Sequence, residues 1–199
     1  TQPDRKVGRK QEIIESPVKK FAKEHDIPVY QPEKINNSPE METVISLNPD
    51  LIVTAAYGQI VPEKLLKAPV FGSINVHDSL LPKYRGAAPI HYAVMNGDEK
   101  TGVTIMYMEK KMYAGNMIAQ SEILITDEDD TGTLFEKLTV LGRDALMGSL
   151  PQIFDGTNPS IPQAESKVTF SPSITKAQER VSWDLNATQI HNLIRALRP

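Results

Sequence analysis

Apolar residues follow two spacings along the chain, one typical of strands and one typical of helices, and segments of the two kinds alternate. Strand-like segments, which are continuous apolar runs or strict alternations, are predicted at 51–56, 73–77, 101–108 and 117–125. Helix-like segments, with apolar residues three or four positions apart, are predicted at 17–26, 39–47, 62–66, 89–95, 131–146 and 187–197. Strands that alternate with helices predict an α/β protein with a mostly parallel sheet.

Polar stretches interrupt this pattern in two places. Residues 1–15 are charged and polar and are predicted to form a loop. Residues 155–173 are rich in Pro, Ser, Gly, Asn and Thr, which predicts a linker or a wrapping loop. The run at 51–56 is apolar throughout, as is typical of a strand that is buried on both faces.

Composition narrows the class of protein. The 199 residues are 40% hydrophobic and 24% charged, with a net charge of −3 and no cysteine, which excludes disulfides, cysteine nucleophiles and thiolate metal sites. A pI near 5.8 argues against a generally basic nucleic-acid-binding surface but permits a local basic patch. Neither a membrane span nor a secretory signal is visible, so we expect a cytoplasmic protein without a membrane partner.

Candidate chemistry gathers at the end of the predicted strand 73–77. Asn75 and His77 project to the same side of an extended strand. An amide donor beside an imidazole suits a carbonyl that becomes an oxyanion, as in acyl or formyl transfer. No second histidine or carboxylate stands at ligand spacing, so a metal site is not predicted. A strand-end histidine that holds a loop carbonyl is the alternative interpretation of His77.

A longer motif carries a family resemblance. Residues 75–90, which read Asn-Val-His-Asp-Ser-Leu-Leu-Pro-Lys-Tyr-Arg-Gly-Ala-Ala-Pro-Ile, strongly resemble the folate-dependent formyltransferase family. Residues 102–106 and 114–115 match the second signature region of that family. One branch, whose members formylate methionine on initiator tRNA, is resembled by the segments 1–5, 8–10, 16–19, 170–172 and 194–199. The resemblance therefore covers essentially the whole chain.

The resemblance also implies an organisation. Residues 1–154 would be a Rossmann-like catalytic domain, and 155–199 would be a linker and the start of the connection to a C-terminal β-barrel domain. The family's first strand–helix–strand unit should precede Thr1, and the barrel should follow Pro199. We expect a chain that begins in mid-sheet to be poorly stable by itself, and the longer protein to be a monomer.

Function and site residues follow from the same resemblance. It implies transfer of a formyl group from the co-substrate 10-formyltetrahydrofolate to the α-amino group of methionyl initiator tRNA, without a metal. Asn75 and His77 would be catalytic, while Arg9 and Lys10 lie in a basic loop that would approach the tRNA. The residues expected to contact folate are Gly58, Gln59, Val61, Ser79, Leu80, Leu81 and Pro82.

One position departs from the family. Tyr113 stands where the family places a catalytic aspartate, and a tyrosine supplies no carboxylate. The chain would then be an enzyme of reduced activity, an inactive folate- or tRNA-binding homologue, or the product of a sequence error. Asp78 stands where the family usually has a small residue. It is adjacent to His77 along an extended strand and should point away from it, with loop curvature as the alternative that would let it replace the missing carboxylate. A formyltransferase acting on a sugar-nucleotide amine, which shares the stretch 79–86, is the rival enzyme.

Overall fold

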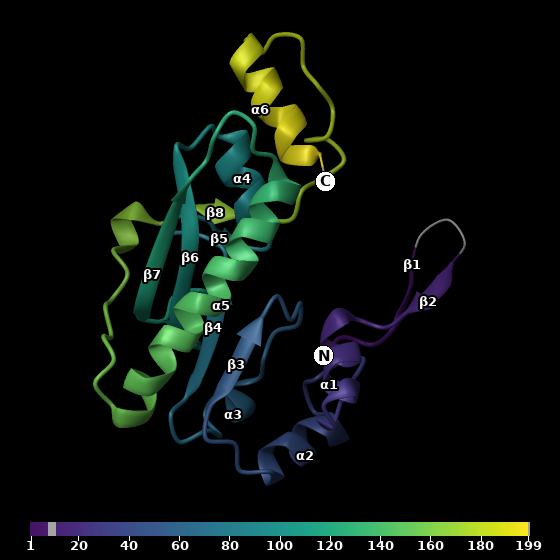
Figure 1. Ribbon diagram of the computed structural model, residues 1–199, viewed down its shortest axis with the longest axis vertical. Helices are drawn as coiled ribbons and strands as arrows, with labels where there is room; N and C mark the ends of the chain where they lie inside the picture. Colours follow the sequence, from purple (N-terminus) through teal and green to yellow (C-terminus); the bar gives the residue numbers. More distant parts are fainter. Residues whose placement is uncertain (8–10, 199) are drawn as a thin grey trace. The chain divides into compact units, whose positions relative to one another are not determined.

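The computed structural model describes residues 1–7 and 11–198 in two compact units, Thr1–Gly72 and Ser73–Pro199. In chain order, the elements of the first unit are β1 (Arg5–Val7), β2 (Glu12–Ile14), α1 (Pro17–Glu24), α2 (Pro39–Ser46), β3 (Ile52–Ala55) and α3 (Glu63–Leu66) (Figure 1).

Serine–proline pairs begin α1 and α2, the two longer helices of the first unit. The hydroxyl oxygen of Ser16 accepts a hydrogen bond of 3.2 Å from the backbone N–H of Lys19 in α1. The hydroxyl oxygen of Ser38 accepts one of 3.1 Å from Met41 in α2. Each cap satisfies a backbone N–H that has no partner within the helix, which fixes where the helix begins.

Two expectations for the first unit are wrong. Residues 1–15 contain a hairpin, because β1 pairs antiparallel with β2 and places Arg5 opposite Ile14. Strands of three residues are too short for apolar periodicity to reveal. The strand β3 is not buried on both faces, since Val53 is 42% exposed and Ala55 is also exposed. A continuous apolar run favours a strand but does not determine which faces are covered.

The second unit carries a sheet with a long helix against it. Its elements are β4 (Ser73–His77), β5 (Arg85–Gly86), α4 (Pro89–Met95), β6 (Lys100–Tyr107), β7 (Met117–Leu124), α5 (Thr131–Asp155), a 3-10 turn (Glu165–Lys167), β8 (Phe170–Ser171) and α6 (Ala187–Leu197). The helices and strands predicted from residue 73 onward are all present, and most ends differ by a few residues, but α5 runs to Asp155, nine residues past its predicted end at 146.

Strand direction differs from the expectation of a mostly parallel sheet. The strand β6 pairs antiparallel with both β4 and β7, while the short pair β5–β8 is parallel. A turn over residues 108–116 joins β6 to β7, and a connection of that length closes only an antiparallel pair. The α/β class is confirmed, but β4, β6 and β7 pair antiparallel, and the parallel pair β5–β8 forms a separate two-stranded sheet.

The long helix α5 crosses the sheet of the second unit (Figure 1). Ile74, Val103 and Ile105 of the sheet are fully buried, as is Leu134 of α5. A Cβ atom at Gly142 would lie 3.1 Å from the side chain of Val76, so the glycine permits close approach of helix and strand. This packing fixes β4, the strand that carries Asn75 and His77.

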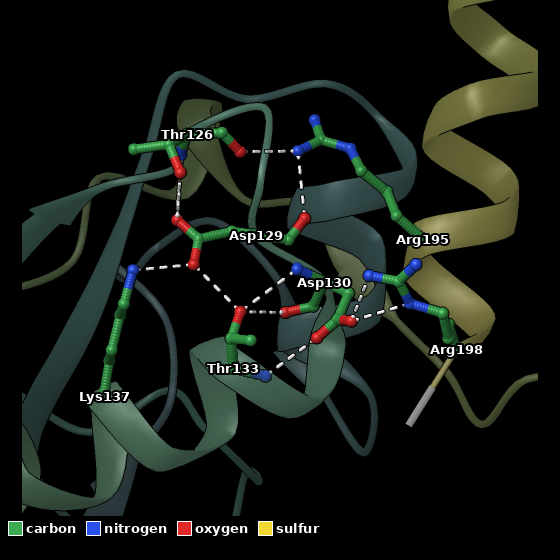
Figure 2. Close-up of polar contacts among 7 residues, drawn as sticks. All are labelled: Thr126, Asp129, Asp130, Thr133, Lys137, Arg195 and Arg198. Carbon is green, nitrogen blue, oxygen red and sulfur yellow. Dashed lines mark hydrogen bonds and ion pairs between the residues drawn. The ribbon is translucent and has the colours of Figure 1, made fainter.

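Charged side chains join the start of α5 to the end of α6. We call Asp129, Asp130, Lys137, Arg195 and Arg198, with Thr126 and Thr133, the α5–α6 charge cluster (Figure 2). The carboxylate of Asp129 accepts hydrogen bonds from Lys137 at 2.6 Å and from the Thr126 hydroxyl at 2.9 Å.

Arg195 of α6 and Arg198, the residue after α6, complete the α5–α6 charge cluster. Arg198 donates to the carboxylate of Asp130 at 2.8 Å, and Arg195 donates to the backbone oxygens of Thr126 and Asp129 at 2.8 and 3.1 Å. The cluster therefore anchors α6 to the second unit. Within residues 1–7 and 11–198, no helix is both long and apolar enough to span a bilayer.

Candidate active site

His77 is the last residue of β4 and is only 4% exposed. Its Nε2 lies 2.9 Å from the carbonyl oxygen of Tyr84, which also accepts a hydrogen bond of 3.0 Å from the hydroxyl of Ser171. Because a carbonyl can only accept, Nε2 must carry the hydrogen. In the neutral ring, Nδ1 is then the acceptor atom.

Burial determines the charge of His77. Desolvation lowers its pKa to about 4, although the hydrogen bond to the Tyr84 carbonyl acts in the opposite direction. The imidazole is therefore neutral at neutral pH. The contact of the alternative interpretation, a histidine that holds a loop carbonyl, is present at Nε2. It leaves Nδ1 of the same ring as the acceptor atom.

Asn75 lies two residues before His77 on the same strand. The pairing with β6 places Asn75 opposite Met106 and His77 opposite Thr104. Since side chains alternate along a strand, the amide and the imidazole project to one side of β4, as the sequence predicts. An amide donor and an imidazole acceptor are thus brought together by regular strand geometry.

The segment Ser79–Pro82, predicted to contact folate, is held by its backbone. The hydroxyl of Thr104 donates to the carbonyl oxygen of Ser79 at 2.6 Å and accepts from the N–H of Leu81 at 3.1 Å. The side-chain amide of Gln120 donates to the carbonyl oxygen of Leu81 at 2.8 Å. Strands β6 and β7 therefore fix this segment, in which Leu80 and Pro82 are half-buried.

Thr104 and Gln120 were not among the residues singled out from the sequence. The signal for Thr104 was available, since it is a polar residue within a strongly apolar strand. Its exposure is 0%, and a fully buried hydroxyl in such a strand needs a partner on a neighbouring segment. Gln120 stands in an alternating strand and carried no comparable signal.

Tyr113 lies in the turn between β6 and β7 and packs against the histidine. The ring centroids of Tyr113 and His77 are 4.9 Å apart, with the planes at 46°. Burial raises the pKa of the Tyr113 phenol, so it stays neutral at neutral pH. Its backbone φ is +58°, in the left-handed region that Asp and Asn adopt more readily than aromatic residues do. The backbone at this position therefore suits the aspartate of the family pattern.

Asp78 directly follows His77 and is half-buried. Burial raises the pKa of its carboxyl. No metal site stands out nearby: among the described residues there is no group of three or more His, Asp or Glu side chains that could hold an ion.

The segment 57–61 belongs to the first unit. Gly58 has a φ of +77°, and the side-chain amide of Gln2 donates to the carbonyl oxygen of Tyr57 at 2.7 Å. The side chain of Gln59 accepts from the N–H of Ile35 at 2.8 Å, and Val61 is buried. The side chain of Gln59 therefore braces the fold. Arg9 and Lys10, predicted to approach the tRNA, lie outside the described residues.

Comparison with known proteins decides the family. The sequence model described as "Formyl transferase" matches residues 1–150. This chain belongs to the formyl transferase family. A second model, "Formyl transferase, C-terminal domain", matches residues 173–199. The family expected from the motif at residues 75–90 is confirmed.

Individual relatives agree with the family. A curated methionyl-tRNA formyltransferase of Enterococcus faecalis is 57% identical over 199 residues, which are 100% of this chain and 64% of the relative. A solved structure of a likely sugar N-formyltransferase from Mycobacterium tuberculosis has a TM-score of 0.69 and 25% identity, covering 91% of this chain and 81% of its own. The structure of WlaRD, a sugar 3N-formyl transferase solved in the presence of dTDP and 5-N-formyl-THF, has a TM-score of 0.74 and 20% identity, covering 97% and 65%.

Proposed function

We propose that the protein containing this chain transfers a formyl group from 10-formyltetrahydrofolate to the α-amino group of methionyl initiator tRNA. The observation that carries the proposal is the pairing of Asn75 and His77 on β4, within the motif of a family to which the chain belongs. The relative from Enterococcus faecalis, at 57% identity, favours the tRNA substrate over a sugar-nucleotide amine. Formylation of initiator tRNA also implies a cytoplasmic protein.

The proposed chemistry divides the work between two side chains. The uncharged amine attacks the formyl carbon, and the N–H of the Asn75 amide stabilises the oxygen that becomes negative. The sequence-based prediction gave His77 the same task. However, the Nε2 hydrogen of His77 is engaged by the Tyr84 carbonyl. The geometry better supports Nδ1 as the atom that takes the proton of the attacking amine, which becomes more acidic as the new bond forms. A proton reaches the folate nitrogen as it departs, and the step needs no metal or covalent enzyme intermediate.

The remaining predicted contacts belong to the same proposal. The fixed backbone of residues 79–82 and the segment with Gly58, Gln59 and Val61 would contact the folate. Arg9 and Lys10 would approach tRNA phosphates. Residues 1–154 would serve as the catalytic domain of a monomer, with 155–199 leading to its C-terminal domain.

The residue at position 113 determines the turnover that we expect for formyl transfer. A neutral phenol cannot replace a carboxylate beside His77, so we propose an active enzyme with reduced turnover. A carboxylate near the ring would favour the protonated imidazole and thereby help His77 to take a proton.

The test is a formyl-transfer assay on methionyl-tRNA with the full protein and the variants Tyr113→Asp and Tyr113→Asn. Both substitutions suit the left-handed backbone, and only Asp adds a carboxylate. We expect measurable transfer by the wild type, and an increase of about tenfold or more with Asp but not with Asn.

Two outcomes would contradict parts of the proposal. If neither the wild type nor Tyr113→Asp transfers formyl while folate still binds, the protein is a binding homologue and the proposal is wrong. Formylation of a sugar-nucleotide amine in place of methionyl-tRNA would contradict the tRNA assignment. Resequencing the gene across codon 113 is the first control.

A further inference from the structure

Arg85 is a buried cation that neither the motif nor the proposed chemistry explains. It lies in β5, and its side chain is only 2% exposed. Its Nε and Nη2 donate to the side-chain oxygen of Gln163 at 3.0 and 2.8 Å, and Nη2 also donates to Glu165 at 2.9 Å. A buried guanidinium is costly unless its donors find such partners, so this arrangement is specified by the fold.

Gln163 connects Arg85 to the turn that carries Tyr113. Its side-chain nitrogen donates to the carbonyl oxygen of Tyr113 at 2.8 Å and to that of Gly115 at 2.8 Å. Both hydrogens of the amide are therefore used, and the amide oxygen accepts twice from Arg85. Gln163 is 8% exposed, so water does not readily replace these bonds.

The turn itself has little freedom to adjust. Tyr113 has a left-handed backbone, and a Cβ atom at Gly115 would lie 1.9 Å from the carbonyl oxygen of Tyr107. Two carbonyl groups of such a turn, fixed by one amide, determine where the side chain at position 113 points. That side chain is the one in contact with His77.

The other contact of His77 depends on the same region. The carbonyl oxygen that receives its Nε2 hydrogen belongs to Tyr84, the residue before Arg85. The N–H groups of Tyr84 and Arg85 donate to the hydroxyl and the carbonyl oxygen of Thr169, each at 2.9 Å. Arg85 thus lies between the segment that holds His77 and the residue that holds the turn.

We propose that Arg85 and Gln163 are positioning residues, which act together to hold the side chain of residue 113 against His77. Gln163 lies in the stretch 155–173, which the sequence marks as a linker and which falls between the two family matches, at 1–150 and 173–199. The inference rests on the proposed function only for its kinetic consequence. The geometric consequence can be measured without any formyl transfer.

The decisive variant is Gln163→Glu in the full protein. A carboxylate keeps both acceptor bonds from Arg85 but cannot donate to the carbonyl oxygens of Tyr113 and Gly115, so the turn should move. Gln163→Met removes the same donors without adding charge and serves as a second variant. The matched control is Gln178→Glu, which adds the same charge where the side-chain nitrogen donates to the hydroxyl of Tyr92 at 3.0 Å, and that hydroxyl can donate to the carboxylate instead.

The first readout is the NMR chemical shift of the His77 ring protons. The ring current of Tyr113 displaces this shift, and Tyr113→Asn defines its value without the aromatic ring. We expect Gln163→Glu and Gln163→Met to move the signal towards the Tyr113→Asn value, while Gln178→Glu leaves it in place. A His77 signal that stays at the wild-type position in folded Gln163→Glu and Gln163→Met would overturn the inference.

The second readout separates positioning from substrate binding. In the formyl-transfer assay, Gln163→Glu in the Tyr113→Asp background should lower kcat by about 10- to 100-fold and change KM little. An unchanged kcat would also count against the inference. If the wild type and Tyr113→Asp both fail to transfer formyl, the proposed function fails, and the His77 shift still decides whether Gln163 positions residue 113.

Discussion

The surroundings of His77 and the α5–α6 charge cluster both bury titratable side chains, but His77 is kept neutral whereas Asp129 is kept ionised. His77 has a backbone carbonyl and an aromatic ring beside it, and desolvation lowers its pKa to about 4. Asp129 is also buried, at 3% exposure. Burial alone would raise the pKa of Asp129, but hydrogen bonds from Lys137, Thr126 and Thr133 lower it well below the ordinary value.

The difference separates the environment that we propose to be reactive from a structural one. Every contact of the Asp129 carboxylate described above comes from a donor of the protein, in α5 or in the turn before it, so its charge stabilises the start of α5 (Figure 2). His77 is kept neutral and one of its nitrogens remains an acceptor, as a proton-transfer group requires. Changes at His77 should therefore alter catalysis, and changes at Asp129 should alter stability.

The largest effect is expected from His77→Gln. Loss of the proton acceptor should reduce kcat for formyl transfer by about 10²- to 10⁴-fold, the range for removal of a general base. The melting temperature should change little, because glutamine can still donate to the Tyr84 carbonyl. The assay is single-turnover formyl transfer with the folded fraction checked by circular dichroism. A variant that unfolds, or that keeps wild-type kcat, would place His77 with the structural group.

The second effect is a pH dependence of stability that belongs to His77. Its pKa is about 4 in the folded protein and near 6.5 when unfolded, so the unfolded state binds more protons between these values. Its contribution to the free energy of unfolding is complete above pH 6.5 and is lost as the pH falls towards 4, by about 3 kcal/mol in total. Urea unfolding at several pH values measures it.

The variant His77→Gln is the control for the pH series, and Asp129 should cause a separate loss of stability at lower pH. His77→Gln should lack this loss, so the difference between the two proteins isolates His77 from His91, whose pKa burial also lowers. Asp129 has a lowered pKa, so its contribution is present above its unfolded pKa and disappears only as the pH falls below about 4. Identical pH profiles for wild type and His77→Gln would show that the ring is not desolvated.

Third, Asp129→Asn should lower the free energy of unfolding by about 2 kcal/mol and leave kcat per folded molecule unchanged. The substitution keeps the shape of the side chain but removes the charge that Lys137 faces at 2.6 Å. The control is Asp144→Asn, whose exposed pair with Arg143 should contribute less than about 0.5 kcal/mol. Equal effects of the two variants in urea unfolding would contradict a structural role for the cluster.

The smallest effect is expected at the start of α6. The side chain of Asn186 accepts from the N–H of Gln189 at 2.9 Å, and the side-chain oxygen of Gln189 accepts from the N–H of Asn186 at 3.0 Å. Asn186→Ala should cost about 1 kcal/mol and loosen the helix that carries Arg195 and Arg198. Amide hydrogen exchange should increase in α6 and remain unchanged around His77. Faster exchange around His77 would show that the two regions are coupled.

Local signals in the sequence predicted most of the elements. Apolar residues three or four positions apart placed α1 and α2, and alternation placed Asn75 and His77 on one side of β4. Strand direction could not be predicted, because it depends on how each connection returns to the sheet. The particular carbonyl that His77 holds could not be predicted, because Tyr84 contributes a backbone oxygen. Gln163, which holds the turn that carries Tyr113, was missed because it comes from a stretch with no periodic pattern.

An NMR titration of ¹⁵N-labelled histidine in the full protein would measure both the tautomer and the protonation of His77. We predict a neutral His77 ring at neutral pH, with the hydrogen on Nε2, an unprotonated Nδ1 and a pKa well below that of an exposed histidine. A hydrogen on Nδ1, or a His77 ring that is already protonated near pH 6, would show that the proposed role of Nδ1 is wrong.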